Sequence, residues 1–481
     1  MLRSVTTRAL ARVPSRSVRS LSSSNILLAP KKKQGAQPAK KLKQGYNKKK
    51  DGAGEKKAKA GGMTHLGFDD AVRALKFEKL AVKLDSLEIG KLQHNGLEKL
   101  QQSVVKYDDE TQFALFRLGM FKKFQHHEMF ESPISLVSNN TSKLSNEFID
   151  QLDGPSINNR VCLIGEKGTG KSTLLAQAAA LARSKYNNEV ILLHLESPLK
   201  ITEGSSDYFF NKSLTKFHQP MFTKKWLYKL RSANETIFKK LKLTRDILFT
   251  IKKQEYTLKK DENTVWDLVY KNKDFGKMAS TNAFQFLLEE LIHHSKEVPV
   301  LASIDDISVI TTNPNTAYRH TDLKKIHVSE LEIGDLILKL ISGEVSFSKG
   351  GVLLGESKDS GKDTHTLRVG LRLEQYDPWL KAYECDNTIA NKFLANEGVK
   401  VFDVKNLSSE ESTELLEFYE ATGALKVRPY PAKVHKTLTA VEQAEAASFD
   451  KTLHFEKIAK SYYTITGGNP RELLKSSVLS Y

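Results

Sequence analysis

The apolar residues from position 160 onward alternate between short continuous runs and runs with helical spacing. Strand-like runs occupy residues 161–165, 189–197, 298–310 and 350–357, and a helical pattern over 172–184 follows the first of them. Continuous apolar strands separated by helices are typical of a sheet that is covered on both faces. The pattern therefore predicts an α/β fold with a mostly parallel sheet flanked by helices.

Further helices are expected before and within this alternating section. An amphipathic run over residues 143–152 stops just before a Gly-Pro pair, which is a helix-ending signal. Residues 218–243 and 280–295 also have helical patterns, and both lie between the second and third strands. We therefore expect a helical insertion within the α/β section.

The chain after residue 400 is expected to be helical. Its clearest helix covers residues 407–423, where Ser408 and Glu411 have the spacing of a capping box. In that arrangement the serine side chain and the glutamate side chain each satisfy a backbone amide of the first helical turn. The pattern predicts a separate helical region at the C-terminus.

The positive charge of the chain is concentrated at its N-terminus. The formal net charge is +17, and residues 1–60 hold 5 Arg and 12 Lys against two acids, a net charge of +15. The rest of the chain therefore carries only +2. A basic binding surface is expected of the N-terminal arm rather than of the body.

The first 25 residues contain five Arg and abundant Ser without an acid, and apolar residues stand at helical spacing at Leu2, Val5, Ala9 and Val13. This composition is typical of a mitochondrial presequence, and a disordered basic tail is the alternative. Arg19 stands three residues before Ser22, a spacing that resembles a matrix-protease cleavage site. We expect a presequence over residues 1–21 and a matrix location.

Residues 30–62 are rich in Lys, Gly and Gln and hold too few apolar residues to fold alone. We expect a disordered basic arm over residues 22–62. Lysines in such an arm bind phosphate backbones with release of counterions, which favours contact with RNA, and a solvated linker is the alternative.

Membrane and disulfide classes are disfavoured by the sequence. No run approaches the ~18 consecutive apolar residues that span a bilayer, so no membrane span is expected. Cys162 and Cys385 are far apart and lack a Cys-x-x-Cys or Cys/His pattern. Neither a disulfide framework nor a zinc site is expected.

The segment GEKGTGKS, residues 165–172, stands between a strand and a helix and matches G-x-x-x-x-G-K-[ST]. Its backbone amides and the positive end of the helix dipole converge on one point, which suits a polyphosphate. Lys171 would reach the β- and γ-phosphates, and the Ser172 hydroxyl would bind Mg²⁺. The expected nucleotide-binding residues here are Gly165, Glu166, Lys167, Gly168, Thr169, Gly170, Lys171, Ser172 and Thr173. A glycine-rich turn without a ligand is the alternative.

Two acids end the third strand. Asp305 has the position of a Walker B acid that holds the metal or its water, and Asp306 stands where many ATPases keep the acid that activates water. Asp306 is thus the candidate catalytic residue, although its side chain is shorter than that of Glu. A helix cap or turn is the alternative for this pair.

Two further residues are candidates for contact with phosphate. Ser357 follows the fourth strand, where it would sense the γ-phosphate, although a serine is common in such a turn. Arg471 stands in the first turn of the helix after Gly-Gly-Asn-Pro, where a cation opposes the helix dipole and favours a bound anion. A surface salt bridge is the alternative for Arg471.

The order of a P-loop, an acid-ending strand, a polar strand end and a helical region resembles the AAA+ and STAND branch of P-loop NTPases. More narrowly, GEKGTGKS, the block FHQPMFTKKWLYKLRSANETIF over residues 217–238 and the closing NPRELL are similar to the death-associated protein 3 family. The similarity runs from about residue 110 to the end of the chain, and the block that contains Trp226 is more particular than the P-loop.

This resemblance implies a matrix protein of the small subunit of the mitochondrial ribosome, in contact with small-subunit ribosomal RNA and neighbouring ribosomal proteins. It also implies GTP or GDP with Mg²⁺ in the P-loop, whereas ATP stays possible because the chain has no N-K-x-D guanine motif. A homo-oligomer is not expected. No arginine finger is identifiable, and because such a residue is worth about 10³ to 10⁵ in rate, slow hydrolysis is the most we expect.

Three functions remain open from the sequence. The first is a ribosomal building block that binds nucleotide, the second is a matrix ATPase of AAA+ or STAND type that acts in remodelling or on nucleic acids, and the third is a scaffold with a vestigial P-loop. The expected domains beyond the arm are an N-terminal wrapping extension with helices (63–153), a P-loop nucleotide-binding domain with a helical insertion (154–400) and a C-terminal helical, lid-like domain (401–481).

Overall fold

The computed structural model describes residues 87–122, 125–130, 132–212, 214–251, 254–271, 279–359, 365–381, 383–425 and 451–479. The presequence and the basic arm expected at residues 1–62 lie outside these residues. No helix in the described ranges is both long enough and apolar enough to cross a lipid bilayer.

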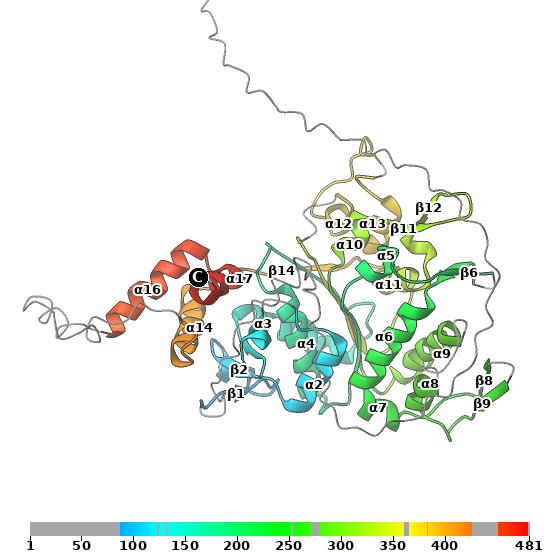
Figure 1. Ribbon diagram of the computed structural model, residues 1–481, viewed down its shortest axis with the longest axis horizontal. Coiled ribbons are helices and arrows are strands. Elements are labelled where there is room, and N and C mark those ends of the chain that lie inside the picture. Colours follow the sequence, from blue (N-terminus) through cyan, green and yellow to red (C-terminus); the bar gives the residue numbers. More distant parts are fainter. Residues whose placement is uncertain are drawn as a thin grey trace, which may run out of the picture. The chain divides into compact units, whose positions relative to one another are not determined.

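A five-stranded parallel sheet forms the centre of the fold (Figure 1). Its spatial order is β14-β4-β13-β10-β5, and every neighbouring pair runs parallel. The strands are β4 (Arg160–Ile164), β5 (Ile191–Leu195), β10 (Val300–Ile304), β13 (Gly350–Gly355) and β14 (Lys400–Asp403). The predicted α/β class with a mostly parallel sheet is confirmed.

The path through the sheet places helices on both faces. The chain leaves β4, crosses to the far edge at β5, and then returns through β10 and β13 to β14 at the other edge. Because crossovers between parallel strands are right-handed, this reversal puts the helix after β4 and the later crossover helices on opposite faces. In Figure 1, α2, α3 and α4 lie on one side of the sheet, and α6 and α11 lie on the other.

Two expectations about this sheet need correction. The third strand was expected to extend to residue 310, but β10 ends at Ile304 and the helix α10 (Ser308–Thr312) follows. Residues 401 onward were expected to be helical, but the expected domain boundary at 400 falls inside β14. Only Phe402 of β14 is buried, so the sequence of this strand lacks the continuous apolar run of the other four strands.

The segment 165–172 is called the P-loop here, after its sequence motif. The helix α4 (Lys171–Lys185) begins at its end and is buried along most of its length. The segments that precede β4 pack beside it: α2 (Asp109–Leu118), α3 (Asn139–Leu144), the π-helical turn η4 (Ser145–Ile149) and the 3-10 turn η5 (Asp150–Asp153). The helix expected over residues 143–152 is therefore present, but its geometry changes from α to π to 3-10 along its length.

A small three-stranded sheet accompanies these helices, with β1 parallel to β2 and β2 antiparallel to β3. The elements are β1 (Gly90–Lys91), η2 (Leu97–Leu100), β2 (Val104–Lys106), η3 (His126–Glu128) and β3 (Ile134–Leu136). The sequence pattern did not predict this sheet.

The insertion between β5 and β10 holds the expected helices. It consists of α5 (Leu199–Thr202), β6 (Phe209–Asn211), β7 (Lys216–His218), α6 (Pro220–Ala233), α7 (Glu235–Lys240), β8 (Ile247–Ile251), β9 (Gln254–Leu258), α8 (Val265–Lys271) and α9 (Ala279–His294). The indole Nε1 of Trp226 on α6 donates to the carbonyl oxygen of His194 on β5, so this block is tied directly to the central sheet.

Between β10 and β14 lie β11 (Asn315–Arg319), β12 (Lys325–His327), η7 (Val328–Glu330), α11 (Glu332–Ser342), α12 (His365–Gly370) and α13 (Asn387–Leu394). The C-terminal section consists of α14 (Ser409–Ala421), α16 (Lys451–Thr466), α17 (Pro470–Leu474) and the π-helical turn η9 (Lys475–Leu479). The capping box of Ser408 and Glu411 is present at the start of α14, as predicted.

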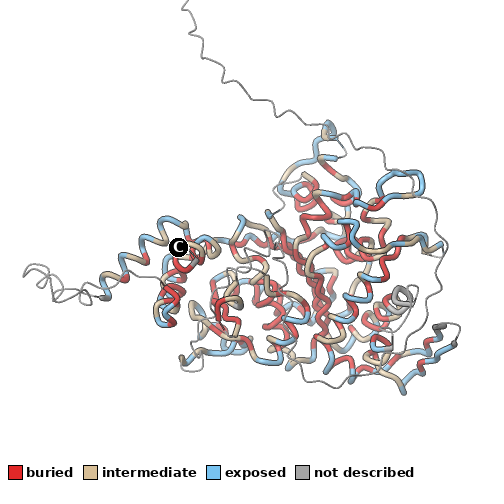
Figure 2. Tube along the Cα trace, viewed as in Figure 1, coloured by how far each residue is buried: buried red, intermediate tan, exposed pale blue. Residues whose placement is uncertain are grey.

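Two main hydrophobic cores hold the described residues together, beside a small cluster of Val369, Cys385 and Ala390. The larger surrounds the central sheet, and Figure 2 shows buried residues concentrated along the sheet and α4. The smaller joins the C-terminal helices to the segment around β3, with Met129, Phe130, Ile134 and Leu136 packed among Leu407, Leu415, Tyr419 and Leu474. The segment before β4 therefore belongs in part to the C-terminal core.

Candidate functional site

The P-loop connects β4 to α4 and contains glycines that a side chain would disturb. Gly170 has φ +96°, and a Cβ built on it would meet no atom within 4 Å, so its backbone faces open space. Gly168 has φ +90°, and a Cβ there would lie 2.6 Å from Oδ1 of Asn469. Both residues adopt the left-handed region that favours glycine, and Gly168 also permits a close approach.

The start of α17 is that close neighbour. The amide Nδ2 of Asn469 donates a 2.8 Å hydrogen bond to the carbonyl oxygen of Lys167. Its Oδ1 accepts from the backbone N–H groups of Arg471 and Glu472, so Asn469 is also the N-cap of α17. The backbone N–H of Arg471 donates to the carbonyl of Gly168 at 3.3 Å. The start of α17 is thus hydrogen-bonded to the P-loop at Lys167 and Gly168, and we call these contacts the clasp.

Lys171 is held by the loop itself. Its Nζ donates to the carbonyl oxygens of Gly165 at 2.8 Å and Glu166 at 2.6 Å. Burial lowers the pKa of Lys171, and the nearby charge of Glu356 opposes that shift. A buried ammonium with carbonyl partners is placed to exchange them for an anionic oxygen, because charged hydrogen bonds are the stronger ones.

Glu356 is a site residue that the sequence did not reveal. It follows β13 directly, is buried, and its Oε2 accepts from the backbone N–H of Gly165 at 3.3 Å. Its carboxylate is therefore already hydrogen-bonded to one backbone amide of the P-loop. The only signal for it was an acid next to Ser357 at a strand end.

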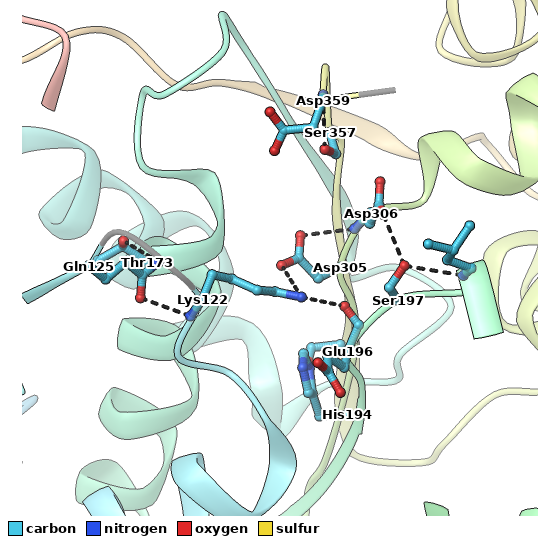
Figure 3. Close-up of polar contacts among 12 residues, drawn as sticks. Lys122, Gln125, Thr173, His194, Glu196, Ser197, Asp305, Asp306, Ser357 and Asp359 are labelled. Atoms are coloured by element: carbon cyan, nitrogen blue, oxygen red, sulfur yellow. Dashed lines mark hydrogen bonds and ion pairs between the residues drawn. The ribbon is translucent and has the colours of Figure 1, made fainter. Parts of the chain in front are cut away.

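Asp305 follows the last residue of β10 directly and is buried. Its Oδ1 accepts from the backbone N–H of Asp306 at 2.9 Å, and its Oδ2 lies 3.4 Å from the Nζ of Lys122 (Figure 3). That Nζ also donates to the carbonyl oxygen of Glu196 at 2.7 Å. Nothing in the sequence pattern pointed to Lys122, which comes from the segment after α2.

Asp306 is oriented by Ser197, at the end of the neighbouring strand β5. The Ser197 hydroxyl donates to Oδ2 of Asp306 at 2.9 Å (Figure 3). Asp306 has φ +59°, a left-handed conformation that is uncommon for residues other than glycine. Burial raises the pKa of Asp306, with the hydrogen bond from Ser197 in opposition. The candidate catalytic carboxylate is thus engaged by a hydroxyl.

Ser357 and Arg471 lie at the mouth of the same space. The hydroxyl of Ser357 accepts from the backbone N–H of Asp359 at 3.3 Å. An Arg471 guanidinium nitrogen and the Nζ of Lys167 lie 3.2 and 2.8 Å from Oδ1 of Asp359. Although burial favours the neutral acid, the Lys167 hydrogen bond and the charge of Arg471 lower the pKa of Asp359. Arg471 forms the salt bridge that was the alternative expectation, and it still lines the cavity.

A cavity of about 750 Å³ collects these residues. Residues 167–173, Asp305, Asp306, Ser357 and Arg471 all line it. Gly165 and Glu166 do not; they line a neighbouring hollow of about 540 Å³. Ligand pockets usually enclose about 300 to 1,000 Å³, so the larger cavity has the size of a small-molecule site.

The cavity also has an apolar part, formed by residues of one hydrophobic cluster. There the segment around β3 and the C-terminal helices contribute Ile134, Leu136, Leu407, Leu415 and Leu474. Polar side chains among them are Ser135, Ser138 and Gln177. Charged and apolar lining residues in one cavity suit a ligand that has both kinds of surface.

The residues present fit a magnesium ion that arrives with phosphate ligands. Ser172 and Asp305 both line the cavity and offer a hydroxyl and a carboxylate, which are oxygen ligands of the kind that Mg²⁺ prefers. Within the described ranges, no three His, Cys, Asp or Glu side chains cluster so as to hold a metal by themselves. A metal here would depend on oxygen ligands from a bound molecule.

The comparison with protein families identifies the chain. The family model described as "Mitochondrial ribosomal death-associated protein 3" matches residues 135–476. The chain belongs to this death-associated protein 3 family. The matched part runs from β3 to η9 and so contains the P-loop, both acids and the α17 clasp. The resemblance seen in the sequence motifs is confirmed.

Two fungal proteins are similar in sequence to about two thirds of this chain. The "Small ribosomal subunit protein mS29" of Neurospora crassa is 24% identical over 375 residues, which is 70% of this chain and 71% of the relative. The protein of the same name from Schizosaccharomyces pombe is 24% identical over 325 residues, 66% of this chain and 65% of the relative.

Proposed function

We propose that this protein is a component of the small subunit of the mitochondrial ribosome and that it supports translation in the mitochondrial matrix. Membership of the death-associated protein 3 family and the names of both fungal relatives support the ribosomal role. The arginine-rich, acid-free N-terminus supports import into the matrix. Its partners are small-subunit ribosomal RNA and neighbouring ribosomal proteins.

We further propose that the protein binds a purine nucleotide, GTP or GDP, with Mg²⁺. The observation that carries this proposal is the single cavity lined by the P-loop, Asp305 and the start of α17. Its charged lining residues suit the phosphates and its apolar lining residues suit the base. The choice of guanine over adenine is supported by the family resemblance.

Four residues at this site have roles in the proposal: Gly170, Lys171, Ser172 and Asp305. Lys171 would leave the carbonyl oxygens of Gly165 and Glu166 for the phosphates. Ser172 and Asp305 would hold the metal, which supplies positive charge to the phosphates when it is bound. The open backbone of Gly170 would let a phosphate oxygen approach the loop amides.

Slow hydrolysis, if any, fits the geometry better than rapid turnover. The carboxylate of Asp306 accepts from Ser197, and Arg471 is the one arginine among the described residues that line the cavity. Arg471 is paired with Asp359. A matrix ATPase of AAA+ or STAND type, which would use Asp306 on water and an arginine from a neighbouring copy, is the second candidate.

Nucleotide binding is tested by thermal unfolding with and without GTP and Mg²⁺. A ligand at 100 times its Kd adds about 2.7 kcal/mol to the free energy of unfolding, so we expect the Tm to rise for the unaltered protein and not for Lys171→Ala. Lys200→Ala is the control, because Lys200 is exposed and its ion-pair partner among the described residues is Glu196. An equal Tm with and without nucleotide in the unaltered protein would refute nucleotide binding.

The ribosomal role is tested by sedimentation of mitochondrial lysate through a sucrose gradient. We expect the protein to travel with the small subunit. A protein that stays at the top of the gradient while ribosomes remain intact would refute the ribosomal role and favour the ATPase.

A further inference from the structure

Lys122 places a positive charge at the carboxylate that the proposed metal needs. Its Nζ lies 3.4 Å from Oδ2 of Asp305 and donates to the carbonyl oxygen of Glu196 at 2.7 Å. Figure 3 shows its side chain extended across the gap between Thr173 and Asp305. The Lys122 side chain is 29% exposed and that of Asp305 only 5%, so the pair is shielded from water on the side of the acid.

A buried carboxylate without a countercharge is strongly disfavoured. Lys122 supplies that countercharge, because it is the cation paired with Asp305 among the ion pairs of the described residues. A divalent cation bound to the same carboxylate would lie close to the ammonium and repel it, since like charges a few ångströms apart strongly disfavour each other in a protein interior. The Lys122 ammonium and a bound divalent cation would therefore compete for the Asp305 carboxylate.

We propose that Lys122 is an internal countercation that competes with Mg²⁺ for Asp305 and so sets how strongly nucleotide affinity depends on the metal. This inference rests on the proposed nucleotide site and adds a residue from outside the P-loop domain to it. When Mg²⁺ is scarce, Lys122 neutralises Asp305 beside the phosphates. When the metal binds with its nucleotide, Lys122 leaves Asp305.

The segment that carries Lys122 also contacts the helix of the P-loop and the C-terminal helices. The Gln125 amide Nε2 donates to the Thr173 hydroxyl of α4 at 3.3 Å, and Gln125 Oε1 accepts from the backbone N–H of Lys122. His126 is hydrogen-bonded to the Tyr419 hydroxyl on α14. Contacts of Gln125 and His126 thus reach α4 and α14.

The test compares GTP affinity with Mg²⁺ and with EDTA in the full-length protein and in Lys122→Met. Met keeps the aliphatic part of the side chain and removes the charge. We expect the ratio of the Kd in EDTA to the Kd in Mg²⁺ to rise about tenfold in Lys122→Met, because Asp305 without its Lys122 partner repels metal-free GTP and the Lys122 ammonium no longer opposes the metal. Lys122→Arg should keep a ratio near that of the unaltered protein.

The matched control is Lys200→Met, because Lys200 pairs with the Glu196 side chain 3.6 Å away without contact to Asp305. Its ratio should equal that of the unaltered protein. An unchanged ratio in Lys122→Met would overturn the inference. So would an equal loss of affinity in Mg²⁺ and in EDTA, which would make Lys122 an ordinary phosphate ligand. No GTP binding by the unaltered protein would instead overturn the proposed nucleotide function.

A measurement without nucleotide decides the pairing separately. Urea unfolding of Lys122→Met, Asp305→Asn and the double variant forms a cycle in which coupled residues are not additive. We expect Lys122→Met alone to reduce the folded-to-unfolded ratio about tenfold, and the added Asp305→Asn to recover part of that loss. Additive effects would overturn the inference whatever the nucleotide titrations give.

Discussion

Asn469 and Lys167 are 302 positions apart in the chain, and the Asn469 side-chain amide donates a 2.8 Å hydrogen bond to the Lys167 carbonyl oxygen. The same side chain caps α17 through its Oδ1. One residue therefore starts the last α-helix of the chain and fastens it to the P-loop. This contact joins the start of α17 to the P-loop, and residues of both line the cavity.

Replacement of Asn469 should separate its two roles. Asn469→Ala loses the N-cap and the bond to Lys167, and we expect a loss of about 1 to 2 kcal/mol in the free energy of unfolding. Asn469→Asp keeps a capping oxygen and loses only the amide donor, so it should cost less. Urea unfolding gives the stabilities and GTP titration the affinities. Equal stability of both variants to the unaltered protein would show that the clasp contributes nothing.

Gly168→Ala should damage the clasp from the other side. A methyl group there would have to displace Asn469 Oδ1, which lies 2.6 Å from the Cβ position, and the φ of +90° adds strain. Gly423→Ala is the control, since Gly423 has φ +70° and open space around its Cβ position. We expect about 1 to 2 kcal/mol of destabilisation from backbone strain in both variants and weaker GTP binding only in Gly168→Ala. Similar GTP affinities would contradict the close approach.

His194 should make the protein sensitive to acid. Burial, assisted by the charge of Lys122, lowers the pKa of His194 from 6.5 to about 3. Below about pH 6.5 the unfolded chain binds a proton at His194 that the folded chain does not bind until about pH 3, so stability falls across that window as the pH is lowered. The loss from this residue should reach about 2 kcal/mol at about pH 5.

Urea unfolding at about pH 7.5 and pH 5 checks this expectation. His194→Gln, which removes the titrating group and keeps an amide near Ser303, should lose less stability on acidification than the unaltered protein. His293→Gln is the control, because His293 is exposed at the end of α9. The same acid-induced loss in His194→Gln and in the unaltered protein would refute the assignment.

Deletion of residues 30–62 should weaken assembly into the small subunit. This lysine-rich segment lies outside the described residues, and the expectation comes from its charge. Because lysines that neutralise phosphates release counterions, the difference between the full-length and the shortened protein should shrink as salt is raised. Gradient sedimentation at several salt concentrations measures it, and a difference that is independent of salt would contradict RNA contact by the arm.

Much of the α/β section could be predicted because its signals are local. The continuous apolar runs of β4, β5 and β13 and the helical pattern of α4 reflect burial on both faces of a sheet, and each can be seen within a few residues. The capping box of Ser408 and Glu411 depends only on neighbouring backbone amides. The strand β14 was missed because only Phe402 of it is buried and its sequence therefore has no continuous apolar run.

The grouping of most P-loop residues with the two acids in one site was predicted from the sequence, and they line one cavity. Their binding of phosphate stays a prediction, and the contacts that surround them were not predicted. The P-loop (residues 165–172) and the two acids after β10 are short motifs, and the chemistry expected of them follows from residue type and order. Lys122 reaches Asp305 and Asn469 reaches Lys167 only because distant segments pack together, and a lysine in a loop or an asparagine before proline has no pattern that names its partner.

The amino-acid sequence alone establishes the alternation of strands and helices and the place of the P-loop, because local sterics, backbone hydrogen bonding and burial periodicity act over a few residues. It also establishes that the positive charge is concentrated in residues 1–60. Packing of the folded chain selects which cation neutralises Asp305, which helix closes over Gly168 and how Asp306 is turned. Those outcomes depend on contacts between segments hundreds of residues apart, and only the three-dimensional arrangement brings such segments within hydrogen-bonding distance.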